Sequence, residues 1–179
     1  MMYSRSVGER RIFKVCNTAP IEGIVILDVD QDGNLDALLT GNSYATEAAT
    51  GRYDAFTGAF LKGNGQGDFI IVSLEKSGFL NDSDASGLAI LQSALGKPLV
   101  IAANNDDSAK LFAKTEPKGE FEPILVAKDA QFAEIFGTNG KQYKLECYYG
   151  SGYLSASTRT IFPNEYIKEI KVTNVEGVS

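Results

Sequence analysis

The sequence contains no histidine among its 179 residues. Histidine is the side chain that most often acts as a general base near neutral pH, and its imidazole is the commonest nitrogen ligand for metals. Its absence excludes imidazole-based zinc sites and every catalytic arrangement that pairs a histidine with a serine or cysteine. The composition therefore argues against the most frequent hydrolytic mechanisms.

Cysteine is scarce as well. Cys16 and Cys147 are the two cysteines of the chain, which is too few for a disulfide-rich scaffold or a cysteine zinc site. Their spacing does not decide whether they pair with each other.

Long apolar runs are missing. No stretch reaches the roughly 18 apolar residues of a membrane-spanning helix, so we expect no membrane insertion. Residues 1–14 are basic without a hydrophobic segment after them, and this pattern does not predict a signal peptide. Two expectations follow: the protein stays inside the cell, or it is the end of a longer exported chain.

Positive charge is in deficit. The chain has 17 basic and 23 acidic side chains, a net charge of −6. Nucleic acids and anionic membranes bind preferentially to basic surfaces. We therefore expect neither as a partner. The length suits one domain with a small appendage, and the 44% hydrophobic content can build a core.

What the sequence does contain is an aspartate-rich stretch at residues 28–36, read Asp-Val-Asp-Gln-Asp-Gly-Asn-Leu-Asp. Carboxylates about 4 Å apart repel by roughly 4 kcal/mol per pair at an effective dielectric of 20, so a cation is expected among them. Oxygen ligands in this number suit Ca²⁺ better than Mg²⁺. The predicted ligands are the side chains of Asp28, Asp30, Asp32 and Asp36 and the backbone carbonyl of Asn34.

The stretch begins like an EF-hand but does not end like one. An EF-hand loop has glutamate at its twelfth position, and that position is Leu39 here. The flanking segments are short aliphatic runs and not amphipathic helices, which predicts a calcium loop between two strands. A solvated acidic turn without a cation is the alternative.

Four strands are predicted around this loop, at residues 21–28, 35–42, 58–63 and 68–74, with a polar insertion at 43–57. The pattern recurs with offsets of 63 and then 52 residues, which predicts a second four-stranded unit at 87–126. The aspartate positions become Leu91, Ser93, Leu95 and Leu99 in that unit. We expect the metal to be lost there and the leucines to pack inward.

The rest of the chain also predicts strands, so the fold class is all-β. Residues 1–20 are a lead-in segment, 21–74 and 87–126 are blade-like repeats, and 129–179 form a C-terminal β unit. A helix is possible only at residues 130–136. Four-stranded repeats of this length are typical of β-propeller blades.

These motifs resemble the repeats of a known protein family. The aspartate loop, with the later Gly-Asn-Gly-Gln-Gly-Asp-Phe at residues 63–69, resembles the FG-GAP/VCBS repeats of integrin-like β-propellers. Residues 148–157 look like the signature of the ASPIC/UnbV module, although Ala156 replaces the usual glutamine. The resemblance implies calcium at the propeller rim, an extracellular or cell-surface location and a protein or glycan ligand.

A propeller needs at least four blades, so two repeats would form an incomplete one. We therefore expect a homo-oligomer or part of a longer chain. The leading functional prediction is a non-enzymatic, calcium-stabilised binding or adhesion module. The alternative is a self-associating structural subunit whose exposed blade edges build an oligomer or filament.

Other side chains allow weaker predictions. An enzyme could use Glu47 and Asp54 as an acid and base pair, but solvated loop residues explain them as well. The motif at Asn81 fits N-glycosylation in a secretory host. Candidate ligand-binding residues are Tyr148, Tyr149, Tyr153, Arg52 and Asp54.

Overall fold

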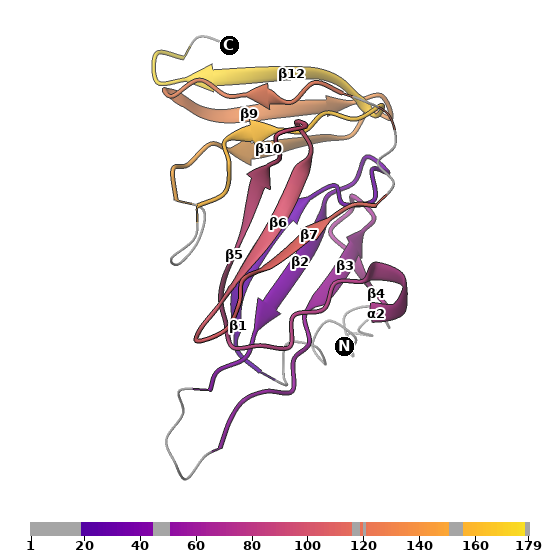
Figure 1. Cartoon of the computed structure of the whole chain (residues 1–179). Helices are drawn as coiled ribbons and strands as arrows, with labels where there is room; N and C mark the ends of the chain where they lie inside the picture. Colours follow the sequence, from indigo (N-terminus) through magenta and orange to yellow (C-terminus); the bar gives the residue numbers. More distant parts are fainter. Residues whose placement is uncertain (1–18, 45–50, 116–118, 120, 151–155, 178–179) are drawn as a thin grey trace, which may run out of the picture.

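The computed structural model describes residues 19–44, 51–115, 119, 121–150 and 156–177. Within these residues the strands form antiparallel sheets, and helix is confined to a single turn, α2 (Leu74–Ser77). The prediction of an all-β fold is confirmed (Figure 1). The described part holds no helix with the length and apolar character needed to cross a membrane.

The first sheet has four strands in sequence order, and each pairs antiparallel with the next. The four strands predicted around the aspartate loop are all present. Both faces of the second strand are covered, which explains why all six of its residues are buried. The strands are β1 (Ile21–Leu27), β2 (Asp36–Gly41), β3 (Ala59–Gly63) and β4 (Phe69–Val72).

The second sheet contains β5 (Ala85–Gln92), β6 (Pro98–Asn104) and β7 (Lys110–Ala113). The prediction of four strands in this unit is wrong. The next strand of the chain, β8 (Ile124–Leu125), leaves the sheet and pairs with β11 (Thr160–Ile161) of the C-terminal unit.

The two sheets share a backbone irregularity. The β1–β2 register shifts between Ile21 and Gly23, and the β5–β6 register shifts between Ala85 and Gly87. In each sheet the first strand therefore has one extra residue, and a glycine follows it. An extra residue of this kind bends the strand, and glycine is common at such bends. Each of the two sheets is therefore irregular near the start of its first strand.

The two sheets pack against each other, with β5 in contact with β1 and β2 (Figure 1). A core of buried residues lies between them: Val25, Leu38, Phe60, Phe79, Leu88, Val100 and Ala102. A second core on the other face of the first sheet contains Leu39, Leu61 and Phe56. The first sheet is thus covered on both sides.

The leucines that replace the aspartates do not pack inward. Leu95 is 83% exposed and Leu91 is 36% exposed, while Leu99 is half-buried. The prediction is wrong because Leu95 lies in the turn between β5 and β6, where the backbone hydrogen bond from Gly96 to Ser93 closes the chain tightly.

The C-terminal unit forms a three-stranded sheet in the order β10, β9, β12, built from β9 (Ala130–Gly137), β10 (Gln142–Glu146) and β12 (Ile167–Asn174). The helix considered at 130–136 is therefore a strand. Its own small core includes Val126 and Ile161, so β8 and β11 belong to this unit. In Figure 1 the unit lies across one end of the two packed sheets.

Gly23 on β1 packs tightly against Leu88 on β5. A Cβ at this position would lie 2.7 Å from the backbone nitrogen of Leu88 and 2.8 Å from its Cβ. Gly23→Ala should therefore separate the sheets and lower the melting temperature by several degrees. The control is Gly150→Ala, because a Cβ there has no neighbour within 4 Å. Equal melting temperatures for the two variants would contradict the prediction.

Candidate metal centre

The loop between β1 and β2 is wrapped around the side chain of Asp28. Its Oδ1 accepts a hydrogen bond from the backbone nitrogen of Asp32 at 3.0 Å, and its Oδ2 accepts one from Gly33 at 2.8 Å. Gly33 has a φ of +85°, which favours glycine. A Cβ there would also lie 2.8 Å from the Cβ of Tyr166. The glycine is therefore required for both the turn and the packing.

Three carboxylates of this loop meet. One ligand oxygen from each of Asp28, Asp30 and Asp36 lies within 4.8 Å of the others, and this cluster could hold a metal ion. Asp36 is fully buried, whereas the other two are half-buried. The sequence prediction found all three residues.

Backbone donors stabilise part of this negative charge. Asp36 Oδ2 accepts a hydrogen bond from Val29 at 2.9 Å, and its Oδ1 accepts one from Gly63 at 2.8 Å. Asp30 Oδ1 differs, because it is buried and has no hydrogen-bond partner in the described residues. A buried carboxylate oxygen without a partner is costly. A cation in the cluster would satisfy it.

Lys62 on β3 supplies the local positive charge. Its ammonium contacts Asp30 Oδ2 and lies 2.8 Å from Asp32 Oδ2. Asp32 therefore faces Lys62 and is not part of the three-carboxylate cluster. The side-chain oxygen of Asn34 accepts a hydrogen bond from Lys141, while its backbone carbonyl as a ligand stays a prediction.

The pKa values follow these surroundings. Burial raises the pKa of Asp36 to about 6, and the neighbouring charge of Asp30 adds to this effect. Burial also raises the pKa of Asp28, with the charges of Asp32 and Asp30 acting in the same direction. Burial alone would raise the pKa of Asp32, but hydrogen bonds from Lys62 and Asn34 outweigh it and lower that pKa. The same contacts raise the pKa of Lys62.

The C-terminal unit docks onto this loop. Asn164, which is buried, donates a hydrogen bond from Nδ2 to Asp28 Oδ2 at 2.6 Å. Lys141 contacts Asn34 and also donates to the carbonyl of Asn64 at 2.9 Å. Together with the packing of Tyr166 on Gly33, these contacts tie the acidic loop to residues more than 100 positions away in the chain.

Sequence reasoning missed Lys62, Lys141 and Asn164. Lys62 could have been found from the sequence, since it lies directly before Gly63 in the strand that is predicted to follow β2. Lys141 and Asn164 had none, because their contacts depend on how the C-terminal sheet packs.

The other candidate residues lie apart from the cluster. Tyr148 and Tyr149 are exposed, and the Tyr149 hydroxyl donates to the carbonyl of Lys128 at 2.9 Å. Asp54 is exposed, and the Arg52 guanidinium lies 4.9 Å from the centre of the Tyr44 ring. Tyr153, Glu47 and Cys16 lie outside the described residues.

Asn81 is not a glycosylation site in this fold. It is fully buried, and its Nδ2 donates hydrogen bonds to Thr40 at 2.7 Å and to Asn104 at 3.0 Å. A glycan could not reach this nitrogen, so the motif has no accessible acceptor here even in a secretory host. Cys147 carries a half-buried free thiol.

No protein-family model matches the sequence, and no curated protein matches it either.

The raised pKa of Asp36 predicts how stability depends on pH. In chelator-treated protein the folded state holds the Asp36 proton more tightly than the unfolded state does, so the free energy of unfolding should fall as pH rises from about 4 to about 6. Urea denaturation across this range measures the slope, and Asp36→Asn should flatten it. An unchanged slope in that variant would assign the pH dependence to other groups.

Proposed function

We propose that this protein is a non-enzymatic binding module of the FG-GAP/VCBS type, stabilised by one Ca²⁺ that Asp28, Asp30 and Asp36 hold. The observation that supports the proposal best is the convergence of three carboxylates with an unpartnered buried oxygen on Asp30. Repulsion within the cluster favours any ligand that brings positive charge to it.

The donor set favours calcium over other metals. It consists of carboxylate oxygens, which are hard ligands, and the chain has no histidine. Mg²⁺ retains most of its waters and demands near-octahedral geometry. Ca²⁺ accepts six to eight oxygens with flexible geometry, so waters or further loop oxygens could complete its shell.

Lys62 sets the affinity that the site can reach. Its ammonium competes with a cation for Asp30 and Asp32. The site should therefore be a weak one, suited to the millimolar calcium found outside cells. We therefore propose an extracellular or cell-surface setting, with a protein or glycan as the ligand of the module.

Self-association is the second candidate function. Strand β4 lies at the edge of the first sheet, and its Ile70 is 64% exposed. An edge strand with an exposed apolar side chain can pair with another chain. Light scattering over a range of concentrations distinguishes the two candidates, because only self-association makes the mass depend on concentration.

Calcium should raise the melting temperature of chelator-treated protein. The expected gain is about 2.7 kcal/mol at a calcium concentration 100 times Kd. Asp30→Ala should abolish this gain, because it removes the carboxylate with the unpartnered oxygen. Asp129→Ala makes the same change of charge at an exposed side chain and should keep the full gain. Thermal unfolding that is insensitive to calcium in the unmodified protein would overturn the proposed metal site.

Lys62→Met should strengthen calcium binding. The substitution removes the competing ammonium, so the affinity should rise by about tenfold, as isothermal titration calorimetry can measure. The same variant should unfold at a lower temperature in the absence of metal, because Asp30 and Asp32 lose their counter-charge.

Lys168→Met is the matched control, since it removes an exposed lysine from the C-terminal sheet. It should bind calcium as the unmodified protein does. A lower affinity in Lys62→Met than in this control would show that Lys62 supports the cation site and does not compete with it.

A further inference from the structure

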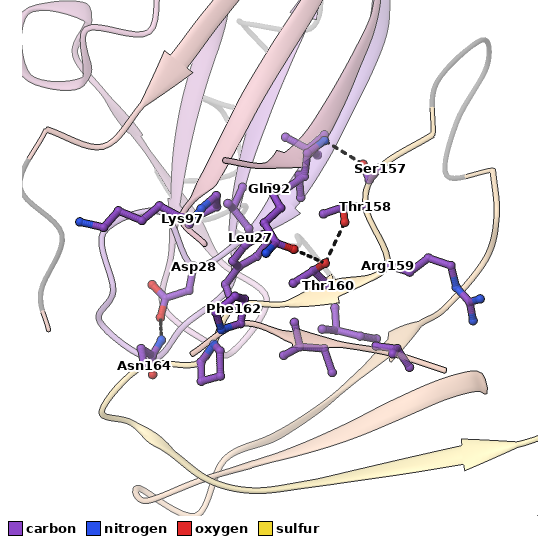
Figure 2. A pocket seen from close by; sticks show the side chains of 18 of the residues that line it. Leu27, Asp28, Gln92, Lys97, Ser157, Thr158, Arg159, Thr160, Phe162 and Asn164 are labelled. Carbon is purple, nitrogen blue, oxygen red and sulfur yellow. Dashed lines mark hydrogen bonds between the residues drawn. The ribbon is translucent and has the colours of Figure 1, made fainter. Parts of the chain in front are cut away.

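A cavity of about 890 Å³ lies between the first sheet and the C-terminal unit. Residues from β1, the β5–β6 turn, β8, β10 and the segment through β11 line it. Figure 2 shows its polar residues from the segment 157–164 near Leu27 and Gln92. Its volume lies in the range of pockets that bind small molecules. It is separate from the proposed calcium chemistry, although Asp28 borders it.

One wall of the cavity is aliphatic and open to solvent. Ile24 and Ile26 point outward from β1 with exposures of 56% and 42%, and Leu95 is 83% exposed in the β5–β6 turn. Large aliphatic side chains from two separate elements thus face the same space. Covering such surface yields about 25 cal/mol per Å². This wall fits an apolar body.

Another wall is polar but largely satisfied. Thr160 donates a hydrogen bond to Gln92 Oε1 at 3.0 Å, and the Thr158 and Thr160 hydroxyls lie 2.8 Å apart (Figure 2). The Gln92 oxygen is therefore used, while its amide nitrogen donates to no protein acceptor in the described residues. The glutamine is exposed, so this nitrogen can donate to an oxygen of a ligand.

The charges around the cavity do not select an ion. Arg159 donates to the carbonyls of Lys128 at 2.9 Å and Ala130 at 2.7 Å, and it stacks 4.3 Å from the centre of the Tyr149 ring. Lys97 and three carboxylates, Asp28, Glu122 and Glu146, also line the cavity, so both signs of charge border it. A charged ligand would lose hydration in this cavity without a dedicated partner.

We propose that this cavity binds an uncharged small molecule with an aliphatic body and an oxygen acceptor. The aliphatic body lies on Ile24, Ile26 and Leu95, and the oxygen accepts a hydrogen bond from the amide of Gln92. Long-chain alcohols and ketones belong to this chemical class. The proposal does not depend on calcium binding.

The probe for the first test is Nile red, a neutral dye that carries a carbonyl and fluoresces in apolar surroundings. We expect saturable binding of one dye per chain. Leu95→Glu should weaken the affinity by about tenfold, because it places a charge on the aliphatic wall. Ile26→Glu should have a similar effect. Leu95 lies in an exposed turn, so its substitution leaves the folded core intact.

Ile70→Glu is the matched control. Ile70 is 64% exposed on β4 of the same sheet but does not line the cavity, so this variant should bind dye normally. An equal loss of affinity in Ile70→Glu and Leu95→Glu overturns the proposal. So does binding of many dyes per chain, or binding that disappears as protein concentration rises, since a second copy would then cover the wall.

The second test separates a neutral ligand from an anionic one. 1-Decanol should displace the dye at a concentration at least about tenfold lower than decanoate does, because three carboxylates, Asp28, Glu122 and Glu146, line the cavity and repel an anion. Gln92→Leu should weaken displacement by 1-decanol relative to displacement by decane, since only the alcohol uses the amide. Displacement by decanoate at the same concentration as 1-decanol would overturn the assignment of a neutral ligand.

Discussion

Repulsion among Asp28, Asp30 and Asp36 is the constraint on which the rest of this structure depends. Three carboxylates within 4.8 Å stay together only if donors surround them. Those donors come from two places: the loop backbone, and β3 through Gly63 and Lys62. Because β3 supplies two of them, the charge of the loop holds this strand against the β1–β2 connection.

The same loop joins the two halves of the molecule. Asn164 reaches Asp28 and Lys141 reaches Asn34 from the C-terminal unit, while Tyr166 covers Gly33. A cation that moved Asp28 would therefore act on the Asn164 contact as well. This connects the proposed calcium site to the position of the C-terminal sheet, and so to one border of the cavity.

The features that the sequence predicted correctly were mostly those with a local pattern. The aliphatic runs and glycine turns around β1 to β4 located these strands, and the spacing of aspartates located Asp28, Asp30 and Asp36. Contacts across long separations were beyond such patterns. Asn164 lies 136 residues from Asp28, and nothing near either residue encodes the pair. The exposure of Leu95 was mispredicted for a related reason, since alignment to an aspartate position says nothing about a shortened turn.

The pairing of β8 with β11 has a consequence for how this chain could have been assembled. In the antiparallel register of the two strands Thr160 lies opposite Leu125 and Ile161 opposite Ile124, and the backbone nitrogen of Val126 donates to the carbonyl of Arg159 at 3.0 Å. Any genetic recombination that joined the C-terminal sheet to a new partner between residues 126 and 129 would cut through this ladder. The C-terminal unit is therefore transferred intact only if the segment containing Ile124 and Leu125 is transferred with it. The natural boundary for exchange thus lies upstream of β8.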